Sequence, residues 1–444
     1  MASDISLGLP SLKLEELVEL VIDHRGKTPK KLGGDFTESG IPVISAIHIK
    51  RGKIIWEERE RFVTQEMYEK WMKEPLKTDD VLLTSEAPLG EVALVPSNDP
   101  LVLSQRLFAI RTKADLLDPK YLLYYLQSQL GQDELQGRAS GSTVIGIRQA
   151  ELLNISVPCP ELHEQRAVGE FLSALDSKIT CNEETSETLV NLAHTVFKSW
   201  FIDFDPVKAK MLGEKPTNMD DATAALFPDS MVESDIGLIP KGWRYGSLGD
   251  VTDLQGGYAF KSSSWTENGV PVIKIGSVKP GFVDLTQVSY VDENMAGDIP
   301  DDYRTPVGSL VIGLTGYVGQ VGMVRTHFPI PLINQRVAKF KPKTGDWRIP
   351  FIYCITRTSK FKGTVEELAT GTAQQNVSNS QILSIPIIIP SGEIQLTFEK
   401  VMEPMFQKII SLADENETLK ATRDALLPRL ISGDLQIRNE TKAS

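Results

Sequence analysis

The sequence has few cysteines and no long apolar run. Its 444 residues include only Cys159, Cys181 and Cys354, which lie far apart and show no metal-ligand spacing. An odd and dispersed set of cysteines argues against a disulfide framework and fits a reducing compartment. No stretch approaches the roughly 18 apolar residues that a membrane-spanning helix needs. We therefore expect a cytoplasmic protein that does not associate with a membrane.

Catalytic motifs are also missing. The chain has no DPPY- or NPPY-type methylation motif, no FxGxG motif, no Walker phosphate loop and no PD…ExK nuclease pattern. None of the five histidines has a partner at HExxH-like spacing. We expect no catalytic residue, no metal site and no cofactor bound by this chain itself.

A general excess of positive charge is absent, since the formal net charge is −12. Proteins that coat nucleic acid need clustered Lys and Arg to neutralise phosphates, so composition argues against that class. The charge is uneven, with −4 over residues 1–160 and +3 over residues 241–390. Most of the acidity lies in segments that read as helix and linker. Any surface for nucleic acid must therefore be local.

The strongest signal present is an internal duplication with a period of 229 or 230 residues. Five blocks repeat in the same order, which chance does not explain. The matched blocks include GIPVISAIHIKRGKI (40–54) with GVPVIKIGSVKPGFV (269–283), DVLLTSEAPLGEVALV (80–95) with SLVIGLTGYVGQVGMV (309–324), LSQR (103–106) with INQR (333–336), and ASGSTVIGIRQAELLNISVPCP (139–160) with ATGTAQQNVSNSQILSIPIIIP (369–390).

Each copy begins with about 150 residues of short strands, broken by Gly, Pro and Asn turns and interspersed with helices such as Pro119–Gln129. The last 40 or so residues instead carry an apolar stripe with a period of 3.5, typical of a coiled-coil seam. Pro404 and Pro428 would start or kink the second stripe's helix. The seam residues are Val168, Leu172, Leu175, Ile179, Asn182, Ser186, Leu189, Ala193, Val196 and Trp200 in the first copy, and Phe398, Met402, Met405, Ile409, Leu412, Asn416, Leu419, Arg423, Leu426 and Leu430 in the second.

These patterns predict an α+β protein with two tandem mixed α/β domains, separated by two long helices packed as an antiparallel coiled coil. The expected boundaries are 1–160 for the first domain, 161–204 for the central helix, 205–240 for a connector, 241–390 for the second domain, 391–435 for the distal helix and 436–444 for a tail.

This order of segments resembles the specificity subunits of type I restriction-modification systems. The resemblance covers nearly the whole chain and rests on four pieces in the same order. They are GIRQAELLNISVPCPELHEQRAVGEFLSALDSKI (146–179), FKSWFIDFDPVKAK (197–210), FPDSMVESDIGLIPKGW (227–243) and LLPRLISGDL (426–435).

The resemblance implies that each domain is a target-recognition domain that reads one half of a bipartite, asymmetric site in double-stranded DNA. It also implies that the helices space the domains and dock two adenine methyltransferase subunits, which a motor-nuclease restriction subunit joins. S-adenosylmethionine, ATP and Mg²⁺ would then belong to those partners. Two alternatives stay open on composition, a stand-alone DNA-binding regulator and an acidic repeat scaffold for protein partners.

The first candidate contacts lie in the basic turn DHRGKTPKK (23–31) and in its counterpart LQGGYAFKSSS (254–264). They meet phosphates or guanine edges if the turn faces DNA, or form an ordinary solvated turn if it does not. The candidates are Arg25, Lys27, Lys30, Lys31, Tyr258 and Lys261.

A second pair of segments is HIKRGK (48–53) and KIGSVKPG (274–281). The basic residues of these segments either position the DNA backbone or form an ordinary solvated hairpin tip. The candidates are Lys50, Arg51, Lys53, Lys274 and Lys279.

The third candidates are Arg106 and Arg336, which follow glutamine in both copies, and Tyr317 in the Gly-rich turn GLTGYVGQVG (313–322). A pair shared by both copies cannot explain two different targets, so positioning on phosphates or a structural role is favoured over base reading. The Gly-rich turn lacks the spacing of a nucleotide loop and reads as a strand–turn–strand corner whose tip could reach a groove. Phe197, Trp200 and Phe201 are either docking anchors or intrachain core.

Overall fold

The computed structural model describes residues 9–50, 52–56, 60–141, 144–234, 237–326, 330–343, 349–369 and 376–437. Contacts divide the chain into two compact units. The N-terminal unit comprises Met1–Ile179 and Leu419–Ser444, and the C-terminal unit comprises Thr180–Thr418. Within the described ranges, no helix combines the length and the apolar character required to cross a bilayer.

The N-terminal unit is built on a four-stranded antiparallel sheet in the order β2-β10-β7-β8. A three-stranded sheet, β6-β3-β9, and two strand pairs, β1-β11 and β4-β5, complete it. The strands are β1 (Ser11–Lys13), β2 (Val18–Asp23), β3 (Ile41–Ile44), β4 (Ile49–Lys50), β5 (Lys53–Ile54), β6 (Phe62–Val63), β7 (Val81–Thr84), β8 (Val92–Leu94), β9 (Val102–Leu103), β10 (Leu107–Thr112) and β11 (Ser156–Pro158). The helices are α1 (Leu14–Leu17), α2 (Gln65–Trp71), α3 (Pro119–Gln127), α4 (Gln129–Gly137) and α5 (Gln149–Leu153).

The C-terminal unit repeats this plan with longer sheets, β15-β24-β21-β22-β19-β18 and β16-β20-β17-β23, and two pairs, β14-β25 and β12-β13. The strands are β12 (Met231–Ser234), β13 (Gly237–Pro240), β14 (Arg244–Ser247), β15 (Thr252–Gly256), β16 (Trp265–Thr266), β17 (Val270–Ile273), β18 (Val278–Lys279), β19 (Gly281–Val283), β20 (Ser289–Val291), β21 (Leu310–Gly313), β22 (Val321–Met323), β23 (Leu332–Ile333), β24 (Val337–Pro342) and β25 (Pro386–Ile389). The helices are α7 (Asp205–Met211), α8 (Asp221–Leu226), α9 (Glu293–Gly297), α10 (Ile349–Thr356), α11 (Ser359–Ala369) and α12 (Asn379–Leu383).

The main sheet of each unit separates two hydrophobic cores. In β7, Val81 and Leu83 pack into one cluster and Leu82 into another. In β21, Leu310 likewise packs into one cluster and Val311 into another. Successive side chains of a strand point to opposite faces, so a strand covered on both faces needs a continuous apolar run. The short apolar runs in the sequence therefore become central strands.

Strand pairing confirms the duplication. In both units a strand pairs in parallel with a later one, Val43 with Val102 in the first unit and Val272 with Leu332 in the second. The preceding glycine, Gly40 or Gly269, has φ +132° in each case. A Cβ at Gly40 would lie 2.5 Å from the Val63 carbonyl oxygen. Only glycine fits this turn without a clash, so both copies retain it.

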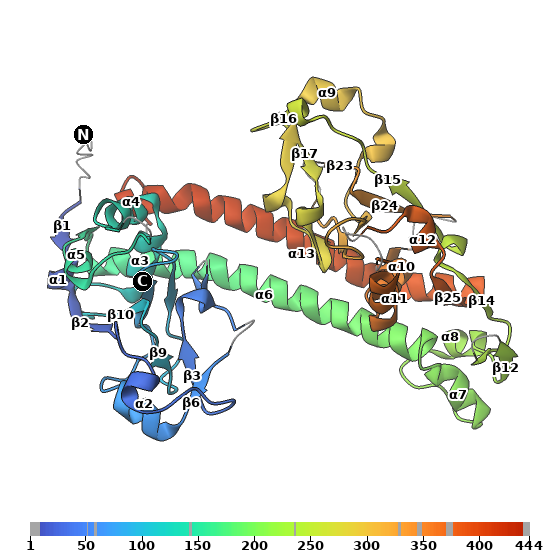
Figure 1. Ribbon diagram of the computed structural model, residues 1–444, viewed down its shortest axis with the longest axis horizontal. Helices are drawn as coiled ribbons and strands as arrows, with labels where there is room; N and C mark the ends of the chain where they lie inside the picture. The colour runs from blue at the N-terminus through green and yellow to red at the C-terminus, as the bar shows by residue number, and fades with distance from the viewer. Residues whose placement is uncertain are drawn as a thin grey trace, which may run out of the picture. The chain divides into compact units, whose positions relative to one another are not determined.

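The two long helices are α6 (Leu162–Phe201) and α13 (Gly392–Ser432), which pack antiparallel (Figure 1). In the N-terminal unit, Arg423 Nη1 lies 2.7 Å from Asp176 Oδ1. In the C-terminal unit, Asn182 Nδ2 donates to Asn416 Oδ1 at 2.8 Å. Every seam residue expected from the sequence is buried or half-buried. The predicted fold, two α/β domains with an antiparallel helix pair, is thus confirmed.

One detail of the helices differs from the simplest sequence interpretation, and one open alternative is resolved. Pro404 and Pro428 do not start α13, because the helix begins at Gly392 and runs through both. Both prolines lie on the exposed side. Phe197, Trp200 and Phe201 are each 5% exposed or less and belong to the core around Phe398, so they are intrachain core. Their rings meet mostly edge to face, which aromatic pairs favour.

Candidate nucleic-acid interface

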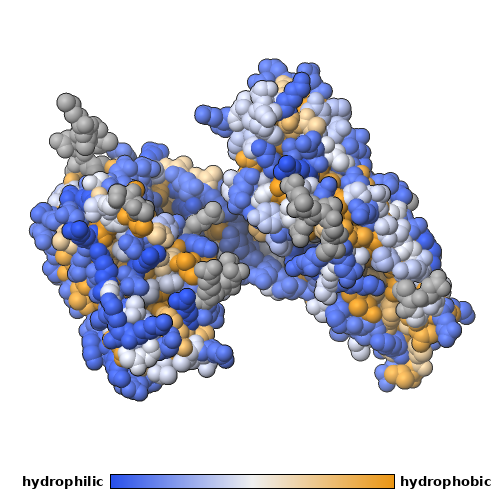
Figure 2. Space-filling view, in the orientation of Figure 1, coloured by the Kyte–Doolittle hydropathy of each residue, from blue (hydrophilic) through white to orange (hydrophobic). Residues whose placement is uncertain are grey.

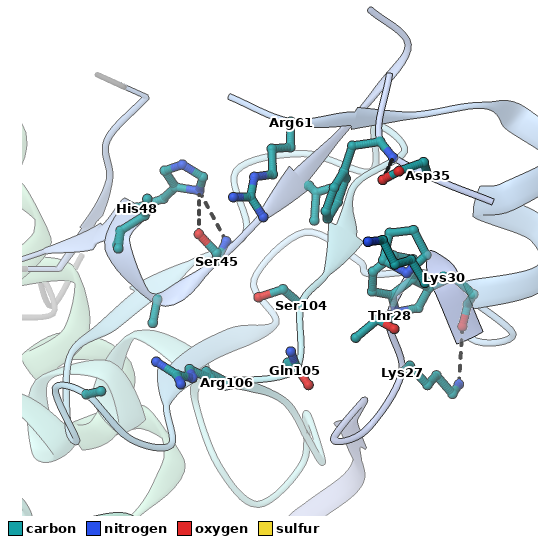
Figure 3. A pocket seen from close by; sticks show the side chains of 17 residues that line it. Lys27, Thr28, Lys30, Asp35, Ser45, His48, Arg61, Ser104, Gln105 and Arg106 are labelled. Carbon is teal, nitrogen blue, oxygen red and sulfur yellow. Dashed lines mark hydrogen bonds between the residues drawn. The ribbon is translucent and has the colours of Figure 1, made fainter. Parts of the chain in front are cut away.

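A cavity of about 500 Å³ in the N-terminal unit gathers several of the predicted basic residues (Figure 3). Four cationic side chains line it, against a single carboxylate, Asp35. Asp35 Oδ1 already accepts a hydrogen bond from the Phe36 backbone at 2.8 Å. The cavity therefore presents net positive charge. Its cationic residues are Lys27, Lys30, Arg61 and Arg106.

The basic turn supplies one wall of this cavity. Gly26 has φ +79°, which permits the tight turn after β2, and Lys30 begins a 3₁₀ turn over Lys30–Leu32. Lys27 Nζ donates to the Trp71 carbonyl at 3.3 Å. Lys31 is exposed but does not line the cavity.

Arg25 is held away from this role by three contacts. Its Nε lies 3.1 Å from Asp23 Oδ2, and its Nη2 donates to the Ile147 carbonyl at 3.1 Å. Its guanidinium also lies 4.8 Å from the centre of the Phe108 ring. The side chain thus ties the turn to the domain.

His24 also ties the basic turn to the domain. Its side chain is buried, with Nδ1 3.2 Å from the Leu103 carbonyl oxygen. Burial lowers the pKa of the imidazole below its ordinary value, because the charged form is poorly solvated there. His24 is therefore a neutral structural group at neutral pH.

The second basic segment forms the hairpin of β4 and β5. Lys50 is exposed and Lys53 half-buried, and their positions are paired across the hairpin. Arg51 lies outside the described residues. His48, just before the hairpin, lines the cavity, and the centre of its ring lies 4.9 Å from that of Trp56, with the two planes tilted by 39°.

Gln105 and Arg106 project into the cavity from the turn between β9 and β10 (Figure 3). Both are exposed, and Arg106 Nε lies 3.0 Å from Glu86 Oε1. This ion pair neutralises part of the charge of Arg106, which fits a positioning role better than free base reading.

Sequence reasoning missed one cavity residue, Arg61. Its guanidinium lies 4.8 Å from the centre of the Phe36 ring, and Figure 3 shows the side chain between His48 and Asp35. Among the described residues its guanidinium makes no hydrogen bond or ion pair. A signal for the ring beneath it was present, because the aromatic–Thr–Glu pattern at 36–38 recurs at 265–267.

In the C-terminal unit, the candidates are distributed differently. The Tyr258 ring packs against Phe260 and Tyr303, at 5.0 and 5.4 Å between centres, so it contributes to a small core. Lys261 is exposed beside it. Of this pair, only the lysine is free to reach a ligand.

Lys274 Nζ lies 3.5 Å from the centre of the Trp265 ring. Burial lowers the pKa of this amine, because the charged form loses solvation. Lys279 Nζ donates to Gln287 Oε1 at 3.1 Å. Tyr317 is 61% exposed at its turn, and Arg336 is also exposed.

The arrangement provides cations, amides and exposed rings. Among the described residues, no three His, Cys, Asp or Glu side chains gather as metal ligands would. Convergent Lys and Arg side chains at strand ends are the chemistry of anion binding and groove contact. The fold and the site define a duplicated recognition protein joined by a helical pair.

Comparison with known families agrees with that class. Residues 10–191 and 240–421 each match the family described as type I restriction modification DNA specificity domain. The chain therefore belongs to the type I restriction-modification specificity family, and the resemblance inferred from its motifs is confirmed.

Full-length relatives support the same placement. The chain is 27% identical to the type I restriction enzyme HindI specificity subunit of Haemophilus influenzae, over 82% of this chain and 88% of that protein. It is 26% identical to the MjaIX specificity subunit of Methanocaldococcus jannaschii, over 93% and 90%. The crystal structure of the type I restriction-modification S subunit from M. genitalium shares the fold, with a TM-score of 0.55, 17% identity, and coverage of 97% and 98%.

Proposed function

We propose that this chain reads a bipartite, asymmetric site in double-stranded DNA, with each unit reading one half. The observation that carries the proposal is the duplication, in which one strand topology occurs twice with different polar side chains at equivalent places. Two related readers in one chain match two half-sites, as the two subunits of a dimeric DNA-binding protein do. Divergence between the copies makes the two half-sites differ.

The N-terminal cavity supports a role in DNA contact. Lys30 is exposed at its wall, and Lys27 and Arg106 are held in place by neighbouring groups. Fixed cations position a phosphate backbone without carrying sequence information. The net charge of −12 then limits non-specific attachment, because repulsion opposes binding outside the local cationic site.

The helical pair has a second proposed role, which is to set the gap between half-sites and to dock two adenine methyltransferase subunits. Each helix contributes residues to both units. At 1.5 Å per residue, each spans roughly 60 Å. Figure 2 shows a mainly hydrophilic face with scattered apolar patches. Leu192 on α6 and Leu396 on α13 are 46% and 52% exposed, so each helix offers an apolar side chain to a partner.

Catalysis and its cofactors are proposed to come from partners. The described residues offer positioning and recognition groups, while methyl transfer requires S-adenosylmethionine, and ATP-driven cleavage requires ATP with Mg²⁺. A motor-nuclease subunit would join through the methyltransferase. The chain then supplies specificity to an enzyme assembled around it.

The test is to co-express the chain with a methyltransferase subunit of its own type I system and map methylated adenines in the host DNA. We expect two short, different half-site sequences separated by a fixed gap. Retention on duplex DNA should fall with rising salt, and should need the methyltransferase. Tight sequence-specific binding by the isolated chain would favour a stand-alone regulator. No binding in either state would favour a protein scaffold.

A further inference from the structure

Both units hold a cation over an aromatic ring at the same place in the fold. The rings are Phe36 and Trp265, each followed by a threonine. Thr37 bridges to Phe62 in the N-terminal unit, and Thr266 pairs with Tyr290 in the C-terminal unit. Phe62 and Tyr290 in turn pair with the proline of the neighbouring strand, Pro42 or Pro271. The two rings are therefore structurally equivalent, and we call this position the ring seat.

The cation at the ring seat comes from a different strand in each unit. Arg61 lies opposite Val43, and the position opposite Val272 in the other unit is Ser289. Lys274 follows β17 directly, and the residue that follows β3 is Ser45. At these two places the N-terminal unit has Arg61 and Ser45, and the C-terminal unit has Ser289 and Lys274. Both units keep an aromatic ring at the ring seat, but the cation over that ring differs.

Their equivalent position distinguishes the cation–ring contacts of Arg61 and Lys274 from incidental surface contacts. Five cation–ring contacts occur among the described residues, a normal frequency for a chain of this length. Of the five, those of Arg61 and Lys274 occupy equivalent places. Their cations also differ in the property that base reading uses, which is donor geometry.

Arg61 is the cavity arginine whose donors remain available. Arg106 is paired with Glu86, whereas Arg61 is exposed and its guanidinium makes no hydrogen bond or ion pair within the described ranges. Stacking on Phe36 restrains the guanidinium plane while leaving its edge donors unused. A planar fork of donors matches the O6 and N7 acceptors of guanine, whereas an ammonium is a compact point charge.

We propose that the ring seat is a specificity-determining position in each unit, with Arg61 reading a guanine edge in one half-site and Lys274 contacting a base edge in the other. This assignment rests on the proposed function. It explains how two copies of one fold select different half-site sequences, because the chemistry and the origin of the seated cation differ.

The experiment uses the full chain assembled with its methyltransferase and a pool of random-sequence duplex DNA, with bound duplexes sequenced. Arg61→Ala should lose preference at one position of one half-site, by roughly 5- to 150-fold, and leave the other half unchanged. Arg61→Lys should keep most of the affinity and lose most of the preference. Lys274→Ala should alter only the other half-site.

Lys70→Ala is the matched control, because Lys70 is an exposed cation of the same unit, paired with Glu66 and outside the cavity. It should select the wild-type sequences. If the Arg61 variants also select the wild-type sequences, the assignment is overturned. It is overturned equally if they weaken all sequences alike with a lower salt dependence, which marks a phosphate contact. A wild-type complex without sequence preference would overturn the proposed function itself.

Discussion

At the residue scale, His24 gives the N-terminal unit a defined response to acid. Its pKa is lowered by burial, and the same cause lowers the pKa of His194 in the C-terminal unit. Each histidine binds a proton more readily when unfolded, where its pKa is near the ordinary 6.5. Unfolding therefore takes up protons as the pH falls through that value, and stability is lost on the acid side.

We predict that the free energy of unfolding falls between pH 7 and pH 5.5, by at most about 1 kcal/mol for each histidine. Carboxylates whose pKa is lowered, such as Asp220 and Asp250, change protonation at or below the ordinary pKa of a carboxylate. They therefore do not affect stability between pH 7 and pH 5.5. Urea unfolding of the wild type and of His24→Gln at the two pH values measures the effect. An equal decline in both proteins would show that His24 does not contribute.

Individual contacts at the site were the least predictable feature. The basic turn was identified from composition, yet Arg25 is captured by a carbonyl 122 residues away, at Ile147. Arg61 was missed because its seat exists only once β3 has paired with β6. Such contacts depend on long-range pairing, which a single local window of sequence does not contain.

At the element scale, the two asparagines of the helix pair form a buried polar contact. Asn182 donates to Asn416 at 2.8 Å and to Glu415 Oε2 at 3.0 Å. A buried amide that loses its partner costs about 1–3 kcal/mol, whereas replacing both partners by apolar groups can be nearly neutral. A polar pair at a seam position also specifies register.

We predict that Asn182→Leu and Asn416→Leu each destabilise the protein by about 1–3 kcal/mol, and that the double variant recovers much of that loss. A double-mutant cycle by urea unfolding gives the coupling. The recovered variant should be less specific in register, seen as broader cysteine cross-linking between engineered sites on α6 and α13. Additive losses would mean that the pair is not coupled.

The helices were predictable because their signal is local and repeated. A seam of period 3.5 over some 40 residues needs no knowledge of the rest of the fold. The effect of Pro404 was harder to judge, because proline generally disfavours a helix interior, whereas α13 runs through Pro404 with the proline on its exposed side.

At the scale of the whole molecule, the hydrophobic clusters of the two units do not include the middle of the helix pair. One cluster of the N-terminal unit includes Leu172, and one cluster of the C-terminal unit begins at Leu189 on α6. A heptad such as Leu172–Lys178 therefore overlaps a core, and Asp176 also accepts a hydrogen bond from Tyr124 at 2.8 Å. Residues 179–185 and 414–420 belong to none of the hydrophobic clusters formed by the described residues.

We predict that removing 179–185 and 414–420 together keeps both units folded and shifts the gap accepted between half-sites. Seven helical residues correspond to about 10 Å, or about three base pairs. Mapping methylated adenines in a host that carries the shortened chain measures the gap. Removing 179–185 alone, which breaks the register of the pair, is the control and should abolish assembly. An unchanged gap in an active complex would refute the spacer role.

The duplication and its family were accessible from sequence because order and spacing survive divergence. FTESG (36–40) and WTENG (265–269) keep an aromatic residue and a glycine that the same turn demands. The target bases were not accessible, because groove reading depends on loop geometry and on DNA shape.

The central claim is that each unit reads its own half-site. Its most direct test is to replace residues 1–160 with the equivalent segment of a family member of different specificity, and then to map methylated adenines in the host. We predict that one half of the bipartite site changes, while the other half stays the same. A change in both halves, or in neither, would contradict it.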